Sequence, residues 1–216
     1  DSDGDGFTDA EEIVSGTDET DPSSTITYSL PDTVTRIAYE GFNYGVDEIV
    51  AGLDGGSGWT ANSTWVGTLG NFIIGEATLG YKGLSTLGNQ LLWTSGTSNG
   101  ANVTGVKRAI SKQDDGIVYL QFLSKFQGVS NYGAENIRLY LDEVLQGGIG
   151  GNDGATTMSI LNSSLLVDQS SSVSIGDENL VIVQFDYTAN TTKLWLNPDL
   201  STFDYVNPGS PDATSD

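Results

Sequence analysis

The 216-residue sequence contains no cysteine and no histidine, and it has only five prolines and one methionine. Without cysteine the chain forms no disulfide and offers no thiolate nucleophile and no cysteine-bound zinc. Without histidine it has no Ser-His-Asp triad, no histidine-ligated zinc and no histidine general base. These two absences exclude the hydrolases and metalloproteases that depend on those side chains.

Basic residues are also scarce, because eight lysines and arginines stand against 29 aspartates and glutamates, giving a formal net charge of −21. Nucleic acids and anionic lipids are bound through basic side chains, so we expect neither as a partner. The sequence has no apolar run long enough to span a bilayer, and we therefore expect no membrane insertion. A surface this acidic favours divalent cations.

The first twelve residues carry acidic side chains in the spacing of a calcium-binding loop. Carboxylates occupy loop positions 1, 3, 5, 9 and 12, and a glycine occupies position 6, where such loops turn sharply. The alternative is a solvated acidic segment that binds no metal, but such a segment has no reason to place its carboxylates and glycine at these positions. The sequence therefore predicts a Ca²⁺ site whose ligands are Asp1, Asp3, Asp5, the backbone carbonyl of Phe7, Asp9 and Glu12.

The longer run DSDGDGFTDAEEIVSGTDETDPSS, residues 1–24, resembles the thrombospondin type 3 repeats of bacterial extracellular proteins. The resemblance implies that Asp18 and Asp21 also contact calcium. Those repeats occur in series, often as calcium-stiffened spacers, which implies neighbouring domains in a parent protein. Because extracellular calcium modules bind at about 10⁻⁴–10⁻³ M, we expect a secreted or cell-surface location. A short helix over 10–15 is expected to leave the loop.

From residue 35 onward, short runs of Val, Ile, Leu and aromatic residues alternate with clusters of Gly, Ser, Thr and Asn, which is the all-β pattern. Residues 179–187 and 191–197 are expected to form a hairpin through a turn at 188–190, with the first strand half-buried. The glycine-rich segment 147–154 is expected to be a flexible loop, and the polar tail 207–216 has no strand character. Further strands are predicted at 35–40, 71–79, 102–111, 116–126, 136–143 and 155–161.

Two stretches of the body resemble laminin-G-like, concanavalin A-like jelly-roll domains of secreted bacterial proteins. RIAYEGFNY at 36–44 with LDGGSGW at 53–59 is similar to their opening, and FDY with LWLNP, within 185–198, is similar to a hairpin near their end. The resemblance implies an antiparallel two-sheet jelly-roll sandwich. It divides the chain into a calcium-binding repeat at 1–24, a linker at 25–34 and the sandwich at 35–216.

In such domains one or two strands follow that hairpin. We therefore expect that the domain closes differently, or that a missing strand leaves an edge open to a strand from a neighbour.

The sequence leaves the function of the sandwich open between two classes. We expect a non-catalytic extracellular module that recognises a glycan or a protein ligand; the alternative is a self-associating structural unit of an adhesin stalk, surface layer or filament. Trp195 alternates away from Leu194 and Leu196 and is the candidate ligand-binding ring, whereas Trp59 is expected to pack internally. A glycoside hydrolase needs only two carboxylates and is the minor alternative, because the Glu-x-Asp-x-x-Glu run of laminarinase-type enzymes is absent.

Overall fold

The elements that the structure defines are all β-strands, and every pairing between them is antiparallel. In the described part of the chain, no helix is long and apolar enough to cross a membrane. The computed structural model describes residues 2, 9, 13, 17–21, 23–24, 34–60, 63–67, 72–76, 79–81, 88–93, 105–125, 135–141, 144–151, 157–162, 165–172 and 176–215.

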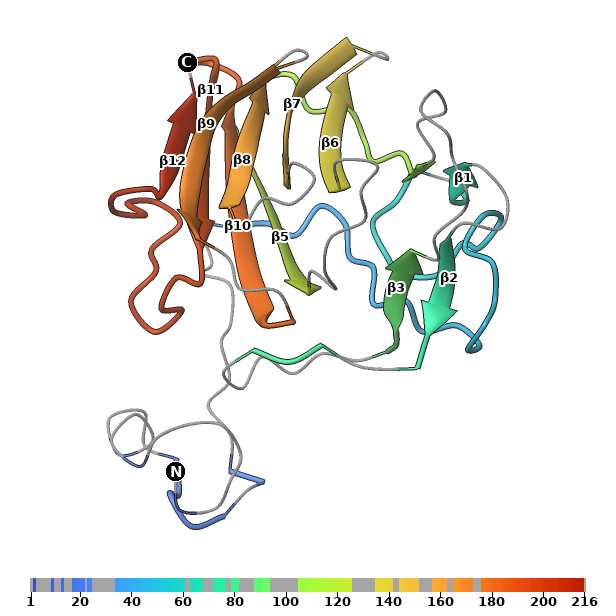
Figure 1. Ribbon diagram of the computed structural model, residues 1–216, viewed down its shortest axis with the longest axis vertical. Helices are drawn as coiled ribbons and strands as arrows, with labels where there is room; N and C mark the ends of the chain where they lie inside the picture. The colour runs from blue at the N-terminus through green and yellow to red at the C-terminus, as the bar shows by residue number, and fades with distance from the viewer. Residues whose placement is uncertain are drawn as a thin grey trace.

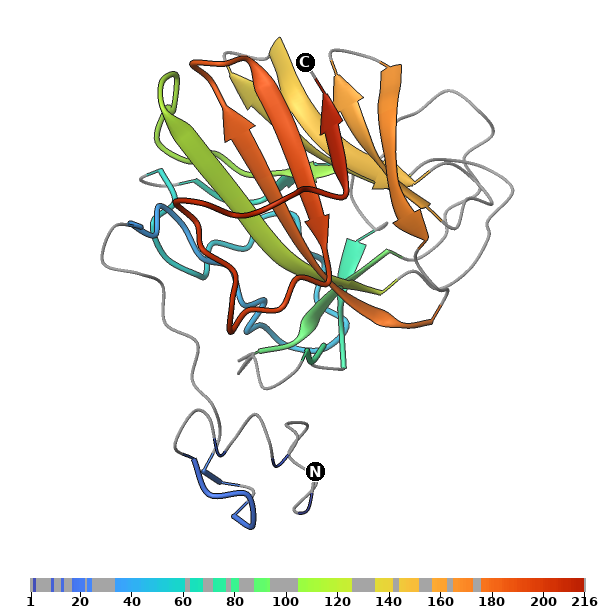
Figure 2. The same ribbon diagram turned by 90° about the vertical axis from the view of Figure 1, so that its left-hand side faces the viewer.

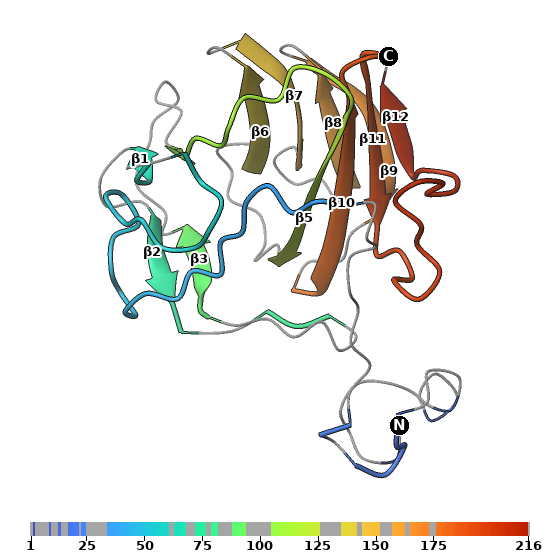
Figure 3. The same ribbon diagram turned by 180° about the vertical axis from the view of Figure 1, so that it is seen from behind.

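Two four-stranded sheets form the larger part of the molecule, and they lie one in front of the other in Figure 1 and Figure 3. The first has the order β12-β11-β10-β5, from β5 (Ile117–Lys125), β10 (Glu178–Asp186), β11 (Thr191–Leu196) and β12 (Ala213–Ser215). The second follows the chain in the order β6-β7-β8-β9, from β6 (Glu135–Leu141), β7 (Val144–Gly151), β8 (Thr157–Asn162) and β9 (Leu165–Ser172).

The facing sides of these two sheets share one hydrophobic core. Val181, Val183 and Phe185 of β10 and Leu194 of β11 pack with Ile160 of β8, and Ile160 is fully buried. Burial of each such side chain stabilises the fold by roughly 1.5–3 kcal/mol. This contact between β8 and the β10–β11 hairpin therefore joins the two sheets.

The opposite face of the first sheet is covered by the connection between β11 and β12. Leu180, Ile182 and Trp195 are buried there beneath Phe203 and Tyr205. The connection crosses this sheet as the dark red trace in Figure 2. Because its residues pack on the outward side, β10 is buried along almost its whole length, and the prediction of a half-buried strand is wrong.

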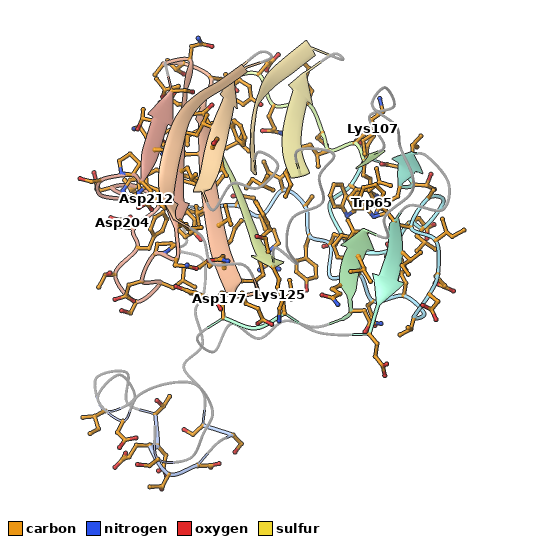
Figure 4. All side chains as sticks on the ribbon, viewed as in Figure 1. Trp65, Lys107, Lys125, Asp177, Asp204 and Asp212 are labelled. Carbon is orange, nitrogen blue, oxygen red and sulfur yellow. The ribbon has the colours of Figure 1, made fainter. Side chains whose placement is uncertain are left out.

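The remaining strands are short and lie to one side of the larger sheets (Figure 1). They form two two-stranded sheets, one from β1 (Val66–Gly67) and β4 (Val106–Lys107) and one from β2 (Phe72–Gly75) and β3 (Gln90–Trp93). Trp65 and Lys107 mark this part in Figure 4, whereas Lys125 and Asp177 lie together at one end of β5 and β10. The described N-terminal residues lie away from both large sheets in all three ribbon views.

The predicted hairpin is present, since β10 and β11 pair from Val181–Leu196 to Asp186–Thr191. The strand predicted at 35–40 is wrong, because only Tyr39 makes a bridge there, to Ser57. The glycine-rich segment is also not a loop throughout. Residues 147–151 belong to β7, whose backbone pairs with β6 on one side and β8 on the other, and a ladder of backbone hydrogen bonds needs no side chains.

The polar tail contains a strand that its composition does not indicate. β12 pairs with β11, with Ala213 opposite Leu194, and Ala213 and Ser215 are buried while Thr214 is exposed. Asp212 fixes the entry to β12, because its carboxylate accepts a hydrogen bond from the Leu196 N–H and its own N–H donates to the Leu194 carbonyl. Three small residues are too short a run to give a periodic signal.

The burial alternation in β12 gives a stability prediction. Ala213→Asp would bury a carboxylate at a side chain that is 3% exposed, and we expect the free energy of unfolding to fall by about 2–4 kcal/mol. The matched control is Thr214→Asp on the exposed face opposite Lys193, expected to lower it by a smaller amount because the new carboxylate stays in water. Urea denaturation followed by circular dichroism measures both, and equal effects would show that β12 is not packed as described.

Candidate functional site

Most of the predicted calcium loop lies outside the described residues, namely Asp1, Asp3, Asp5, Phe7 and Glu12, and so does most of the short helix expected at 10–15. Asp9 is described, and its two carboxylate oxygens accept hydrogen bonds from the Ser2 N–H and hydroxyl, each at 2.8 Å. The Ser2 hydroxyl lowers the pKa of Asp9 below its usual value. Its carboxylate is therefore ionised at neutral pH, as a calcium ligand must be.

Asp18 and Asp21, the two ligands implied by the thrombospondin-type resemblance, have the same local geometry. Oδ1 of Asp18 accepts bonds from the Thr20 N–H and hydroxyl, and Oδ1 of Asp21 accepts the equivalent bonds from Ser23. The Ser23 hydroxyl lowers the pKa of Asp21. The Asp21 N–H donates to the Asp18 carbonyl at 3.2 Å, so the two turns are joined. Within the described residues, no three acidic side chains gather around one point.

The most constrained group of polar side chains in the described structure is centred on Glu40 and Arg108. Arg108 Nη1 lies 2.8 Å from Glu40 Oε2, and the two side chains are 3% and 7% exposed, respectively. Nη1 also donates to the Gly55 carbonyl, while Nη2 donates to the Asp54 carbonyl and Nε to the Ser63 carbonyl, at 2.6–2.9 Å. Every nitrogen of the guanidinium is therefore engaged.

The Glu40 carboxylate is equally saturated. Its Oε2 also accepts bonds from the Tyr44 hydroxyl at 3.0 Å and the Trp65 indole N–H at 3.1 Å, while its Oε1 accepts the Phe42 N–H at 2.9 Å. Phe42 has a φ of 52°, which is unusual for a bulky residue, and the bond that its N–H donates to Glu40 supports that backbone conformation. Burial, followed by the bond to Glu40, raises the pKa of Tyr44, so its hydroxyl remains a donor at neutral pH.

Aromatic rings enclose this ion pair. The Arg108 guanidinium lies 4.7 Å from the ring centroid of Trp59, and the Trp65 ring stacks on Phe42 at 5.8 Å. The backbone approaches closely here, because a Cβ on Gly58, whose φ is +77°, would lie 1.9 Å from the Ile37 carbonyl oxygen. Position 58 therefore requires glycine, and the next residue, Trp59, places its ring over Arg108.

We name Glu40, Arg108 and the rings of Tyr44, Trp59 and Trp65 the Glu40–Arg108 cluster. The Glu40 carboxylate accepts four hydrogen bonds, one of them from the guanidinium, and Arg108 also bonds to the chain at residues 54, 55 and 63, so the cluster holds these segments of the chain together. This pairing was not predicted from the sequence. Glu40 lies within the matched YEGFNY run, but nothing local connects it to Arg108, one of the eight basic residues.

Trp195 does lie on the face opposite Leu194 and Leu196, as alternation predicts, but that face is covered. The residue is 4% exposed, and its ring meets Phe203 edge-on at 5.5 Å. Within the described residues, its indole N–H has no hydrogen-bond acceptor. A ring buried in this way offers no surface on which a sugar can stack, because the β11–β12 connection occupies that surface.

Comparison of the chain with protein-family models, with curated proteins and with solved structures found no match. The resemblances to thrombospondin type 3 repeats and to laminin-G-like domains therefore rest on the quoted motifs.

The Glu40–Arg108 cluster gives a second stability prediction. Glu40→Gln leaves the buried guanidinium without its counter-charge, and we expect the free energy of unfolding to fall by about 3–5 kcal/mol. The control is Asp114→Asn, which removes the exposed ion pair with Lys112, whose charged groups lie 3.1 Å apart and whose side chains are each 55% exposed. That change is expected to cost less than about 1 kcal/mol.

Chemical denaturation measures the free energy of unfolding of both variants and so distinguishes the buried ion pair from the exposed one. In the double variant Glu40→Gln/Arg108→Met the total loss should be smaller than the sum of the single losses, because the second substitution removes the uncompensated charge. Additive losses would show that the two side chains do not act as a pair.

Proposed function

We propose that this chain is a non-catalytic, calcium-binding module of a secreted or cell-surface protein that recognises a glycan or another surface ligand. In this proposal residues 1–24 form a thrombospondin type 3-like repeat and residues 35–216 form a jelly-roll sandwich. The observation that carries the proposal is the register of carboxylates and glycine in residues 1–12.

The donor set of the N-terminal segment fits calcium. All its predicted ligands are hard oxygens, and at Asp18 and Asp21 the turn-forming bonds use Oδ1, so that Oδ2 of each lies outside those bonds. A bound Ca²⁺ would neutralise the mutual repulsion of these carboxylates and cross-link a segment that has little apolar material of its own. The role of the metal is thus to fix how the sandwich is presented.

Two features of the body support the jelly-roll part of the proposal. The two four-stranded antiparallel sheets share the core around Ile160. The second motif of the laminin-G-like resemblance, within 185–198, falls on the β10–β11 hairpin. The first motif, 36–44 with 53–59, falls on the Glu40–Arg108 cluster, where Arg108 bonds to both of its stretches. A structural role for Glu40 also favours a binding module over an enzyme that uses this carboxylate.

The second candidate is the assembly unit, and the edge of the first sheet favours it. Among the described residues, β5 pairs with β10 alone, and it is nine residues long. Ile117 at its start is 53% exposed. An unpaired strand edge of this length is a surface to which another strand can add.

The calcium proposal predicts a saturable exothermic or endothermic titration by Ca²⁺ and a loss of affinity when ligands are neutralised. Asp3→Asn and Asp21→Asn should each weaken binding by roughly tenfold, because affinity in such loops follows ligand charge. Glu19→Gln is the matched control, since it removes an acidic group of the same segment that is not a predicted ligand. Calorimetry on chelator-treated protein measures all three; equal affinities, or no binding by the wild type, would refute the site.

The assembly candidate predicts that the protein self-associates with rising concentration and that Ile117→Lys keeps it monomeric. Val66→Lys is the control, because Val66 is also exposed, at 58%, but lies on β1 away from the β5 edge. Sedimentation velocity distinguishes the cases. A wild-type protein that stays monomeric at every concentration would refute assembly through the β5 edge.

A further inference from the structure

We draw no further inference here: the strongest candidate, the edge of β5 that faces away from β10, is the surface already described for the assembly candidate, and among the described residues nothing shows what covers it.

Discussion

The burial of β10 on both faces is the constraint on which the larger part of the structure depends. Its inward side chains, Val181, Val183 and Phe185, require the second sheet, and its outward ones, Leu180 and Ile182, require the β11–β12 connection. Loss of either cover would return several fully buried side chains to water, at roughly 1.5–3 kcal/mol each. The second sheet and the irregular connection are therefore equally necessary parts of one core.

The part built on β1–β4 is held in a different way. Its strands have two or four residues, too few for a strong ladder, and the Glu40–Arg108 cluster takes their place. A buried ion pair is favourable only where hydrogen bonds complete the shells of both charges, and here they do. The result is a region whose geometry is specified by a few directional contacts together with the buried side chains of Val50 and Ile74.

The sequence was informative where structure is local and uninformative where it is not. The β10–β11 hairpin follows from alternation on either side of a short turn, so it was predicted. The cover over Ile182 and Trp195 has no periodicity, and without it both a half-buried strand and an exposed Trp195 were the natural expectations. Glu40 and Arg108 are 68 positions apart, and no pattern in a single sequence joins them. The ligands of the first calcium loop were predicted from spacing, and Asp18 and Asp21 from the resemblance to thrombospondin type 3 repeats; most of the first set lie outside the described residues.

The insertion of one whole sheet between the two long strands of the other has a consequence for how the chain folds. β5 and β10 are neighbours, yet even their closest partners, Lys125 and Glu178, are 53 residues apart. The chain between them forms β6 to β9, in which each strand pairs with the next. The entropy lost on closing a loop grows with its length, so pairing each strand with the next, which closes only small loops, costs little. Once β6 to β9 are paired, the effective chain length between β5 and β10 is shorter, and their pairing costs less as well. We therefore expect the inserted sheet to form before β5 and β10 pair.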